Sequence, residues 1–302
     1  MVTSVTSEAE IRTNLETKPV DWEAGRRAFL QTLGVAASAV LVGGIAAPGS
    51  AAAQTITDAD ILNFALNLEY LEAEFYLRAA YGTGLADADT TGIGTRGDVI
   101  GGRKVIFATP AIRNYAVEIA QDEKKHVLFL RSALGGAKVA RPKIDLRDSF
   151  TAAALAAGLI SPGSTFNPFA NETNFLIAAY IFEDVGVTAY KGAAPLLSNK
   201  SILEAAAGIL AVEAYHAGLV RTIMYARNLF EPARKISNLR DAVDGPTDLD
   251  QGIGNADRSN IVPAVENAIA FSRSPSQVLK IVYLGGYTNG GFFPDGVNGA
   301  IS

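Results

Sequence analysis

Cysteine is absent from the sequence, and its absence excludes three classes of site. A chain without cysteine forms no disulfides, no thiolate zinc sites and no cysteine-ligated iron–sulfur clusters. A metal would therefore need nitrogen and oxygen ligands. Histidine is almost as scarce, since His126 and His216 are the only two in 302 residues. Their positions are therefore informative about where a metal could bind.

Long runs of charge of one sign are also missing. The chain has 26 Lys and Arg against 31 Asp and Glu, which gives a formal net charge of −5 at pH 7. Nucleic-acid binding would need a clustered basic face, so we expect no nucleic-acid partner. Hydrophobic residues make up 49% of the chain, so it can bury a sizeable core in one large domain or two small ones.

The first 53 residues have the order of an export signal. A polar region ends at Arg26 and Arg27, an apolar Ala- and Gly-rich stretch follows to about Ala47, and small residues continue to Ala53. The Arg-Arg-x-Phe-Leu core resembles a twin-arginine signal, a route that implies a protein folded and loaded with its metal before export. The stretch is also long enough for one retained membrane helix. We expect cleavage, export to the periplasm or the extracellular space, and no stable membrane span afterwards.

Four long segments of the remaining chain have the apolar periodicity of helices. We predict these helices over residues 58–81, 110–134, 172–191 and 201–229. Thr57 or Asp58 can cap the first, and Ser201 with Glu204 has the spacing of a capping box at the fourth. Shorter helices are predicted over residues 148–157, 261–273 and 275–284, with irregular chain over residues 230–260.

The order of these elements predicts an all-α fold. Residues 54–230 would form a four-helix bundle with a long crossover between its second and third helices. Residues 231–302 would form a C-terminal extension. We expect its Gly-rich part, residues 285–296, to pack against the bundle as turns.

Both histidines lie in the same motif, Glu-x-x-His. Glu123 and His126 fall in the second predicted helix, and Glu213 and His216 in the fourth. Positions i and i+3 share a helix face, so each pair can offer an oxygen and a nitrogen to one metal. Apolar residues continue the same face on both sides, which indicates inward-facing stripes: Ile119, Leu130, Ile209 and Val220. One such motif is a weak signal, but two that use both histidines of the chain are a strong one.

The other two long helices each supply one glutamate followed seven residues later by a tyrosine. These pairs are Glu69 with Tyr76 and Glu183 with Tyr190. The chain therefore contains two copies of one unit, which would face each other around a pseudo-twofold axis. We predict that six residues hold two divalent metal ions: Glu69, Glu123, His126, Glu183, Glu213 and His216.

Charge is the physical reason for expecting metal here. An unpaired buried carboxylate costs several kcal/mol, and four in one bundle would also repel one another. Two divalent cations balance four carboxylates and leave the imidazoles neutral. Nitrogen and oxygen ligands without sulfur suit iron or manganese, with zinc as a further option. The structural alternative is a metal-free bundle in which these residues are satisfied core groups.

Residues close to these six have weaker predicted roles. Glu72 is an alternative ligand, whereas Glu74 is interpreted as a solvated charge. The two tyrosines would hydrogen-bond ligand carboxylates, or else serve as core aromatics with satisfied hydroxyls. Asp122 and Asp184 stand beside ligands and are candidates for orienting the outer nitrogen of a histidine.

The pattern of one inward Glu and one Glu-x-x-His per helix pair resembles the ferritin-like superfamily over about residues 58–230. A closer likeness is to the ferritin-like desiccation-related family. The residues that carry it are LNLEYLEAEFY at 66–76, SPSQVL at 274–279 and GGFFP at 290–294. Relative to small ferritins, residues 82–109 and 231–302 are additions. A homodimer is compatible with these additions, whereas assembly into a cage is not expected.

Two functional hypotheses follow from this resemblance. The first is redox chemistry with O2 or H2O2 at a dinuclear iron or manganese centre in stress protection, as a catalase-, peroxidase- or ferroxidase-like oxidoreductase. The second is a non-catalytic role in metal sequestration or in protection against desiccation or envelope stress. The sequence alone does not choose between them.

Overall fold

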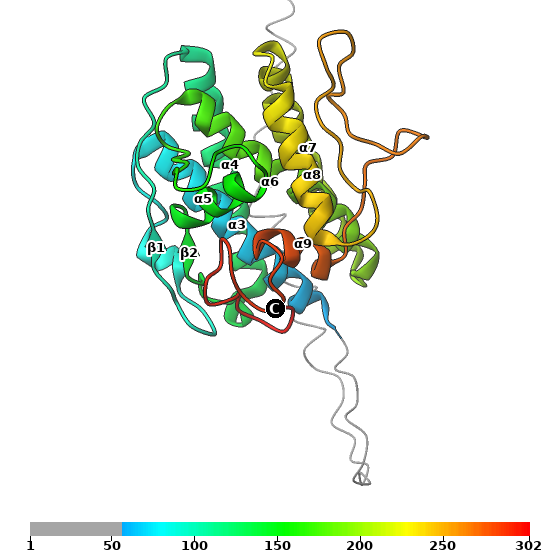
Figure 1. Cartoon of the computed structure of the whole chain (residues 1–302). Coiled ribbons are helices and arrows are strands. Elements are labelled where there is room, and N and C mark those ends of the chain that lie inside the picture. Colours follow the sequence, from blue (N-terminus) through cyan, green and yellow to red (C-terminus); the bar gives the residue numbers. More distant parts are fainter. Residues whose placement is uncertain (1–55) are drawn as a thin grey trace, which may run out of the picture. The chain divides into compact units, whose positions relative to one another are not determined.

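A computed structural model describes residues 56–302, so the predicted export signal lies outside the described residues. The described chain is mainly helical, as the sequence predicts, and its labels follow Figure 1. Its α-helices are α3 (Asp58–Tyr81), α4 (Pro110–Leu134), α5 (Asp148–Ala156), α6 (Glu172–Ala193), α7 (Lys200–Ala226), α8 (Phe230–Asp244) and α9 (Pro275–Val282). Two short parallel strands also pair, β1 (Val99–Ile100) and β2 (Ile144–Asp145).

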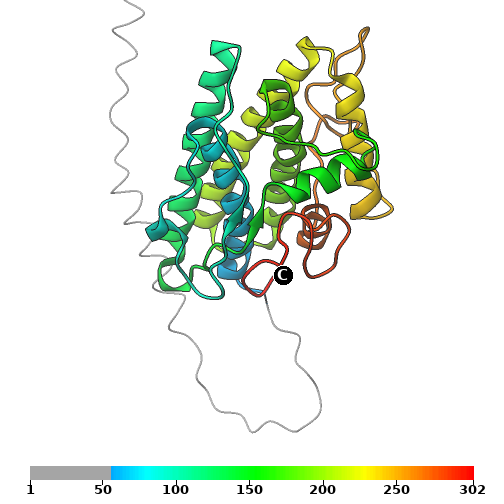
Figure 2. The same ribbon diagram turned by 60° about the vertical axis from the view of Figure 1, so that its left-hand side comes forward.

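The four long helices α3, α4, α6 and α7 form the bundle. α3 packs along α4, α6 packs along α7, and the two pairs meet where α3 contacts α6. Figure 2 shows these four helices running side by side. α3 is buried over most of its surface because it lies inside the bundle, and polar side chains such as Asn67 and Glu69 are buried with its apolar ones. The predicted all-α four-helix bundle is confirmed.

Local capping residues explain where the bundle helices begin and end. Thr57 and Asp60 form a capping box at the start of α3, and Gly82, with φ at 88°, ends that helix. The capping box predicted for Ser201 and Glu204 is wrong. The side chain of Asn199 accepts hydrogen bonds from the backbone at the start of α7 instead, so the helix begins at Lys200.

The C-terminal region differs from its prediction in two places. Residues predicted to be irregular contain α8, an amphipathic helix that buries Ala233 and Ile236. The helix predicted over residues 261–273 is not formed. That segment has no run of helical hydrogen bonds: the N–H of Val265 donates to the carbonyl of Ile269 at 2.9 Å, and the N–H of Arg273 donates to the carbonyl of Thr188 at 3.0 Å.

The Gly-rich tail contributes to the same core as the bundle. Phe292 is fully buried, and its ring centroid lies 4.9 Å from those of Phe150 and Phe182. Its carbonyl accepts a hydrogen bond from the N–H of Asp145 at 3.0 Å. Asn298 also exchanges hydrogen bonds with the buried side chain of Asn67. The tail is therefore packed onto α5 and α6 and tied to α3.

A buried ionic network connects the bundle to the C-terminal region. Its three arginines and three aspartates alternate, and all are at most 6% exposed: Arg221, Arg240, Arg273, Asp184, Asp244 and Asp250. Arg240 lies 2.9 Å from Asp184 and 2.5 Å from Asp250. Arg221 lies 2.7 Å from the same oxygen of Asp184. The interpretation of Asp184 as a partner of a histidine is therefore wrong, because one of its oxygens pairs with two arginines and the other has no hydrogen-bond partner.

Glu74 also departs from its prediction. It is fully buried rather than solvated, and it forms ion pairs with Arg78 at 2.9 Å and with Arg141. Arg141 lies in the crossover after α4, so this pair ties the crossover to α3. The sequence offered no sign of the pair, because Arg141 is 67 residues away.

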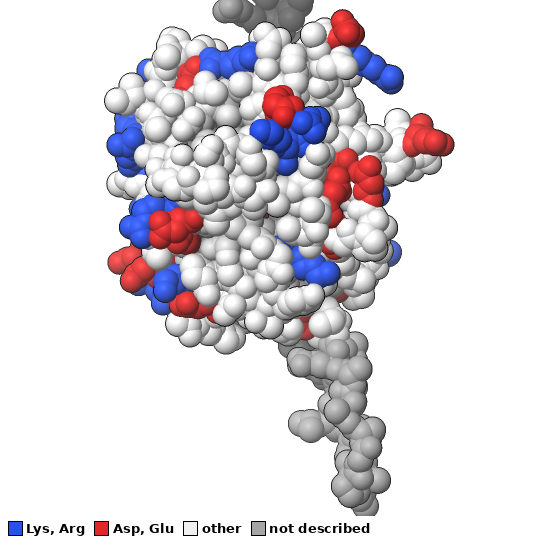
Figure 3. Space-filling model, in the orientation of Figure 1, with Lys and Arg blue, Asp and Glu red and all other residues white. Residues whose placement is uncertain are grey.

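Among the described residues, α7 is long and apolar enough by length and composition to cross a membrane. The core helix of a soluble protein passes the same test. α7 packs on α6 and buries three polar side chains, Glu213, His216 and Arg221. On the face seen in Figure 3, basic and acidic residues are interspersed, with uncharged areas between them.

Candidate metal centre

The six predicted residues come together in the middle of the bundle. Four of them, Glu69, Glu123, His126 and Glu213, offer ligand atoms that all lie within 4.8 Å of one another. Glu183 and His216 form a second such group, again with Glu213. None of the six is more than 8% exposed. The structure therefore brings together every residue of the predicted set, with Glu213 common to both groups.

The two histidines face the carboxylates through the same ring nitrogen. Nδ1 of His126 lies 3.3 Å from Glu69, 3.4 Å from Glu123 and 3.4 Å from Glu213. Nδ1 of His216 lies 3.0 Å from Glu123 and 3.9 Å from Glu183. Glu123 is thus near both imidazoles. With Glu213, it is one of two carboxylates placed between the two halves of the centre.

Many atoms of this centre are buried without a hydrogen-bond partner. They are one oxygen each of Glu69 and Glu183, both oxygens of Glu123 and Glu213, and Nδ1 of each histidine. Leaving a buried polar atom unpaired costs about 1–3 kcal/mol, and more if it is charged. Divalent cations would satisfy these atoms together, and oxygen and nitrogen donors without sulfur suit iron, manganese or zinc. The donor set therefore fits metal ions.

The two tyrosines hold the glutamates of the opposite helix. The hydroxyl of Tyr76 on α3 donates to Oε1 of Glu183 on α6, and that of Tyr190 on α6 donates to Oε1 of Glu69 on α3. Burial and the nearby carboxylates raise the pKa of both tyrosines well above the ordinary value, so their hydroxyls remain protonated donors. Each glutamate keeps its Oε2 unpartnered and available to a metal.

Asp122 lies behind His216, on the side away from the carboxylates. Its Oδ2 is 3.5 Å from Nε2 of His216, while Oδ1 accepts from Lys125 at 2.9 Å. A carboxylate in this place fixes the ring so that Nδ1 faces the centre. In the other half of the repeat, Val212 occupies the corresponding position. The pseudo-twofold symmetry is therefore broken at this point.

Glu72 and Gly186 break the symmetry at a second point. Glu72 is 6% exposed and has an unpartnered oxygen, and the repeat places Gly186 at its corresponding position on α6. A Cβ on Gly186 would lie 2.6 Å from Oε2 of Glu213 and 3.5 Å from Oε1 of Glu72. The glycine therefore leaves room for two carboxylates. Gly186 was not among the predicted site residues, although its equivalence to Glu72 is readable from the repeat.

Burial and mutual repulsion shift the acidity of these carboxyl groups. Burial raises the pKa of Glu69 to about 8, although His126 opposes that rise. Burial also raises the pKa of Glu72 and Glu183 well above the ordinary value, and other glutamates of the centre add to the shift. Burial alone would raise the pKa of Glu123, but its interactions with both histidines have a larger effect and lower the pKa below the ordinary value.

We expect the metal-free protein to lose stability as pH rises from 5 to 9. The pKa of Glu69 is about 8 in the folded chain against 4.5 ordinarily, so its stabilising contribution is complete below pH 4.5 and is lost as pH rises through 8. His216 acts in the same direction. Burial lowers its pKa, but contacts with Asp122 and Glu123 raise it to about 11 from 6.5. The combined loss should be on the order of several kcal/mol.

Urea unfolding of chelator-treated protein at pH 5, 7 and 9 measures this effect. Glu69→Gln should make the decline shallower, because one of the two groups that titrate is removed. Metal-loaded protein should lack the decline, since metal binding strengthens as its ligands lose protons. A metal-free profile that is level or rises with pH would contradict the electrostatic account of the centre.

Comparison with known proteins places this site in context. Residues 57–226 match the family model of the ferritin-like domain. A ferritin-like catalase, Nec2 of Nesocodon mauritianus, is 30% identical over 269 residues, which cover 81% of this chain and 85% of that protein. The desiccation-related protein PCC13-62 of Craterostigma plantagineum is 32% identical over 245 residues, or 74% and 76% of the two chains. No solved structure matches the chain.

Proposed function

This chain belongs to the ferritin-like family, and on that premise we propose that it is a dinuclear metal protein that acts on hydrogen peroxide or dioxygen. The ions are iron or manganese, two per chain. The observation that carries the proposal is the set of unpartnered buried oxygens and imidazole nitrogens that face one another in the bundle. Burying so many unpaired polar atoms costs folding free energy, and bound cations would remove that cost.

Each residue has a definite task in this proposal. Glu69 and His126 would hold one ion and Glu183 and His216 the other, while Glu123 and Glu213 lie between the two groups. The ions supply the paired redox equivalents that peroxide or dioxygen chemistry needs. Tyr76 and Tyr190 hold their glutamates in place by hydrogen bonds.

Glu72 has a separate task in the proposed reaction. Burial, and then the charges of the surrounding glutamates, raise the pKa of its carboxyl group well above the ordinary value. Its Oε2 has no partner within the protein. Glu72 is therefore placed to hold a proton at that oxygen beside the molecule that reacts.

Disproportionation of peroxide is the reaction that we favour. It converts two H2O2 into two H2O and one O2, and needs no external reductant. The likeness to a protein named ferritin-like catalase supports this choice. Protein purified without chelators should contain two equivalents of iron or manganese by elemental analysis and release one O2 for every two H2O2 consumed. A native preparation without metal would refute the site, and a metal-loaded one that releases no O2 would refute the reaction.

Non-catalytic protection is the second candidate. It is favoured by the likeness to a desiccation-related protein, whose name states no reaction. In that case the protein would bind metal, but would neither consume peroxide nor speed oxidation of Fe(II) by O2. Both assays on the same preparation separate the two functions.

Export by the twin-arginine route is part of the proposal. It rests on Arg26, Arg27 and the apolar stretch that follows them. Cell fractionation with N-terminal sequencing of the mature protein tests it. Replacement of both arginines by lysine should leave the full-length protein in the cytoplasm, and unchanged export would argue against this route.

A further inference from the structure

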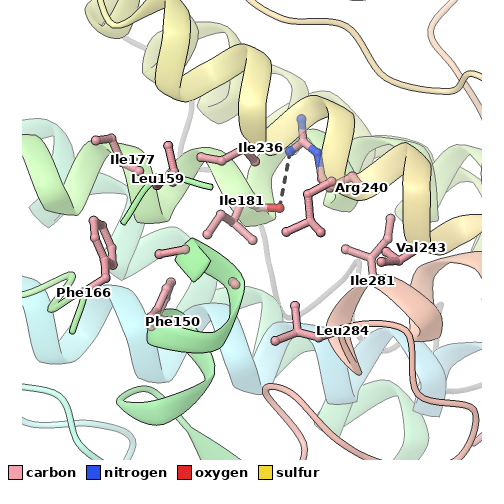
Figure 4. A pocket seen from close by; sticks show the side chains of 13 residues that line it. Phe150, Leu159, Phe166, Ile177, Ile181, Ile236, Arg240, Val243, Ile281 and Leu284 are labelled. Carbon is pink, nitrogen blue, oxygen red and sulfur yellow. Dashed lines mark hydrogen bonds between the residues drawn. The ribbon is translucent and has the colours of Figure 1, made fainter. Parts of the chain in front are cut away.

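A small apolar cavity lies among α5, α6, α8 and α9 (Figure 4). Its volume is about 20 Å³, which is room for one small molecule. Its walls are almost wholly hydrocarbon and include Phe150, Ile177, Ile181, Ile236 and Ile281. The cavity is therefore shaped for an uncharged molecule of two or three atoms.

Arg240 is the one charged residue in the wall, and its terminal nitrogens are already engaged. They donate to the carbonyl of Tyr180 at 2.6 Å, to Asp184 at 2.9 Å and to Asp250 at 2.5 Å. Its Nε is unpartnered. A buried water needs two to four polar partners, so one N–H is too little to hold it. The cavity should therefore stay dry.

A second cavity continues toward the metal centre. Its volume is about 10 Å³, and it shares the side chains of Ile181 and Ile281 with the first cavity. Its far end is lined by Glu72 and Gly186. A Cβ on Gly186 would touch Glu213, so this end reaches the carboxylates of the centre. The side chains of Ile181 and Ile281 thus separate the first cavity from the second, which lies beside the metal centre.

The two cavities follow α6 from the protein surface inward. Ile177 lines the first and Gly186 the second, and nine residues of helix span about 13 Å. The outer cavity is also lined by Leu159, Leu239 and Val243, which are half-exposed. An apolar path therefore connects the outside of the bundle with the Glu72 side of the centre.

We propose that the outer cavity binds dioxygen, and that dioxygen passes through the smaller cavity between the surface and the Glu72 side of the metal centre. The proposal rests on the proposed function, in which O2 is a product or a substrate. Dioxygen is apolar and loses no hydrogen bonds on entering a dry cavity. Hydrogen peroxide would lose the hydrogen bonds it makes to water, so this path discriminates against it.

Peroxide therefore needs another entrance. The polar side of the centre, at Asp122, offers one. The side chain of Asp122 is 27% exposed and contacts His216. Substrate and product would then use different sides of the same site.

Methyl NMR under dioxygen pressure tests the proposal on the metal-free protein. Dioxygen is paramagnetic, so it speeds relaxation of the methyl groups that it contacts. Ile177, Ile181 and Ile281 should show enhancements several-fold larger than Ile202 and Ile209, which are equally buried on α7. Equal enhancement at all five would overturn the dioxygen site, whether or not the protein has redox activity.

A cavity-filling variant tests the path. Ala154 is buried in the cavity wall on α5, whereas Ala156 on the same helix is exposed. Ala154→Val should reduce the enhancement at Ile181 and Ile281 several-fold, and Ala156→Val, the matched control, should not. Full enhancement at both isoleucines in a folded Ala154→Val protein would overturn the path.

The same pair of variants links the path to function. In protein loaded with Fe(II), Ala154→Val should slow oxidation of the Fe(II) by O2 several-fold. Oxidation of the Fe(II) by H2O2, which releases no O2, should be unchanged. An equal effect on both oxidants would overturn the separation of routes. If neither oxidant reacts in wild-type protein but dioxygen enhances relaxation of these methyl groups, the dioxygen site is supported and the proposed function is refuted.

Discussion

Glu213→Gln should remove at least one of the two bound metal ions and most of the stabilisation that metal provides. Glu213 belongs to both ligand groups, and both of its oxygens are buried without partners. A ligand present at 1,000 times its Kd contributes about 4 kcal/mol of stability. For a domain of this size, that corresponds to a rise in Tm of roughly 10 °C on metal addition. We expect this rise in the wild-type protein and little of it in the variant.

Without metal, the same substitution should have the opposite sign. It removes one negative charge from a group of buried carboxyls that repel one another, so the metal-free variant should unfold at a higher temperature than metal-free wild type. Glu204→Gln is the matched control, because Glu204 is exposed on the same helix. Elemental analysis and thermal unfolding with and without chelator measure both effects. A full metal-dependent rise in Glu213→Gln would show that this carboxylate is not a ligand.

Arg240→Ala should be the most destabilising single change outside the metal centre, at about 3–5 kcal/mol. Arg240 is 1% exposed and contacts both Asp184 and Asp250. Its guanidinium group also lies over the ring of Tyr180, and the guanidinium carbon is 4.7 Å from the ring centroid. Removing the Arg240 side chain would leave Asp184 and Asp250 buried without one of their cationic partners. It would also create a cavity beside the ring of Tyr180.

Arg234→Ala on the same helix is the control for Arg240→Ala. Arg234 forms an exposed ion pair with Glu231, and such pairs contribute about 0–1 kcal/mol. Urea unfolding at neutral pH compares the two variants. A loss below about 1 kcal/mol for Arg240→Ala would mean that the buried network adds little to stability. Since Asp184 follows Glu183 in α6, metal content should be measured in parallel.

The bundle helices and the predicted metal-binding residues were readable from the sequence because both depend on local spacing. Helix periodicity, Gly82 and the Thr57 cap are features of neighbouring residues, and the structure places α3 and α4 at the predicted ends. Glu-x-x-His is also local, since residues three apart share a helix face. Two copies of the unit in an apolar setting were therefore enough to bring six residues to one centre, and to indicate the ferritin-like family.

The wrong predictions concern residues whose partners are far away in sequence. Glu74 pairs with Arg141 in the crossover, and Asp184 pairs with Arg221 and Arg240 on later helices. A buried charge and a solvated one look alike in sequence when the partner is a distant arginine. The segment before α9 likewise does not form its predicted helix, because its backbone forms a local turn at residues 265–269 and hydrogen-bonds to α6 at Arg273.

The sequence by itself determined the helix pairs, the repeat and the residues that face one another across it, since each of these depends on periodicity along the chain. Only the tertiary structure decided that Tyr76 and Tyr190 hold the glutamates of opposite helices, and that Glu72 reaches across to the space left by Gly186. It also decided where the apolar cavities lie. These features depend on how two helix pairs meet, and such contacts between distant residues leave no local pattern in the sequence.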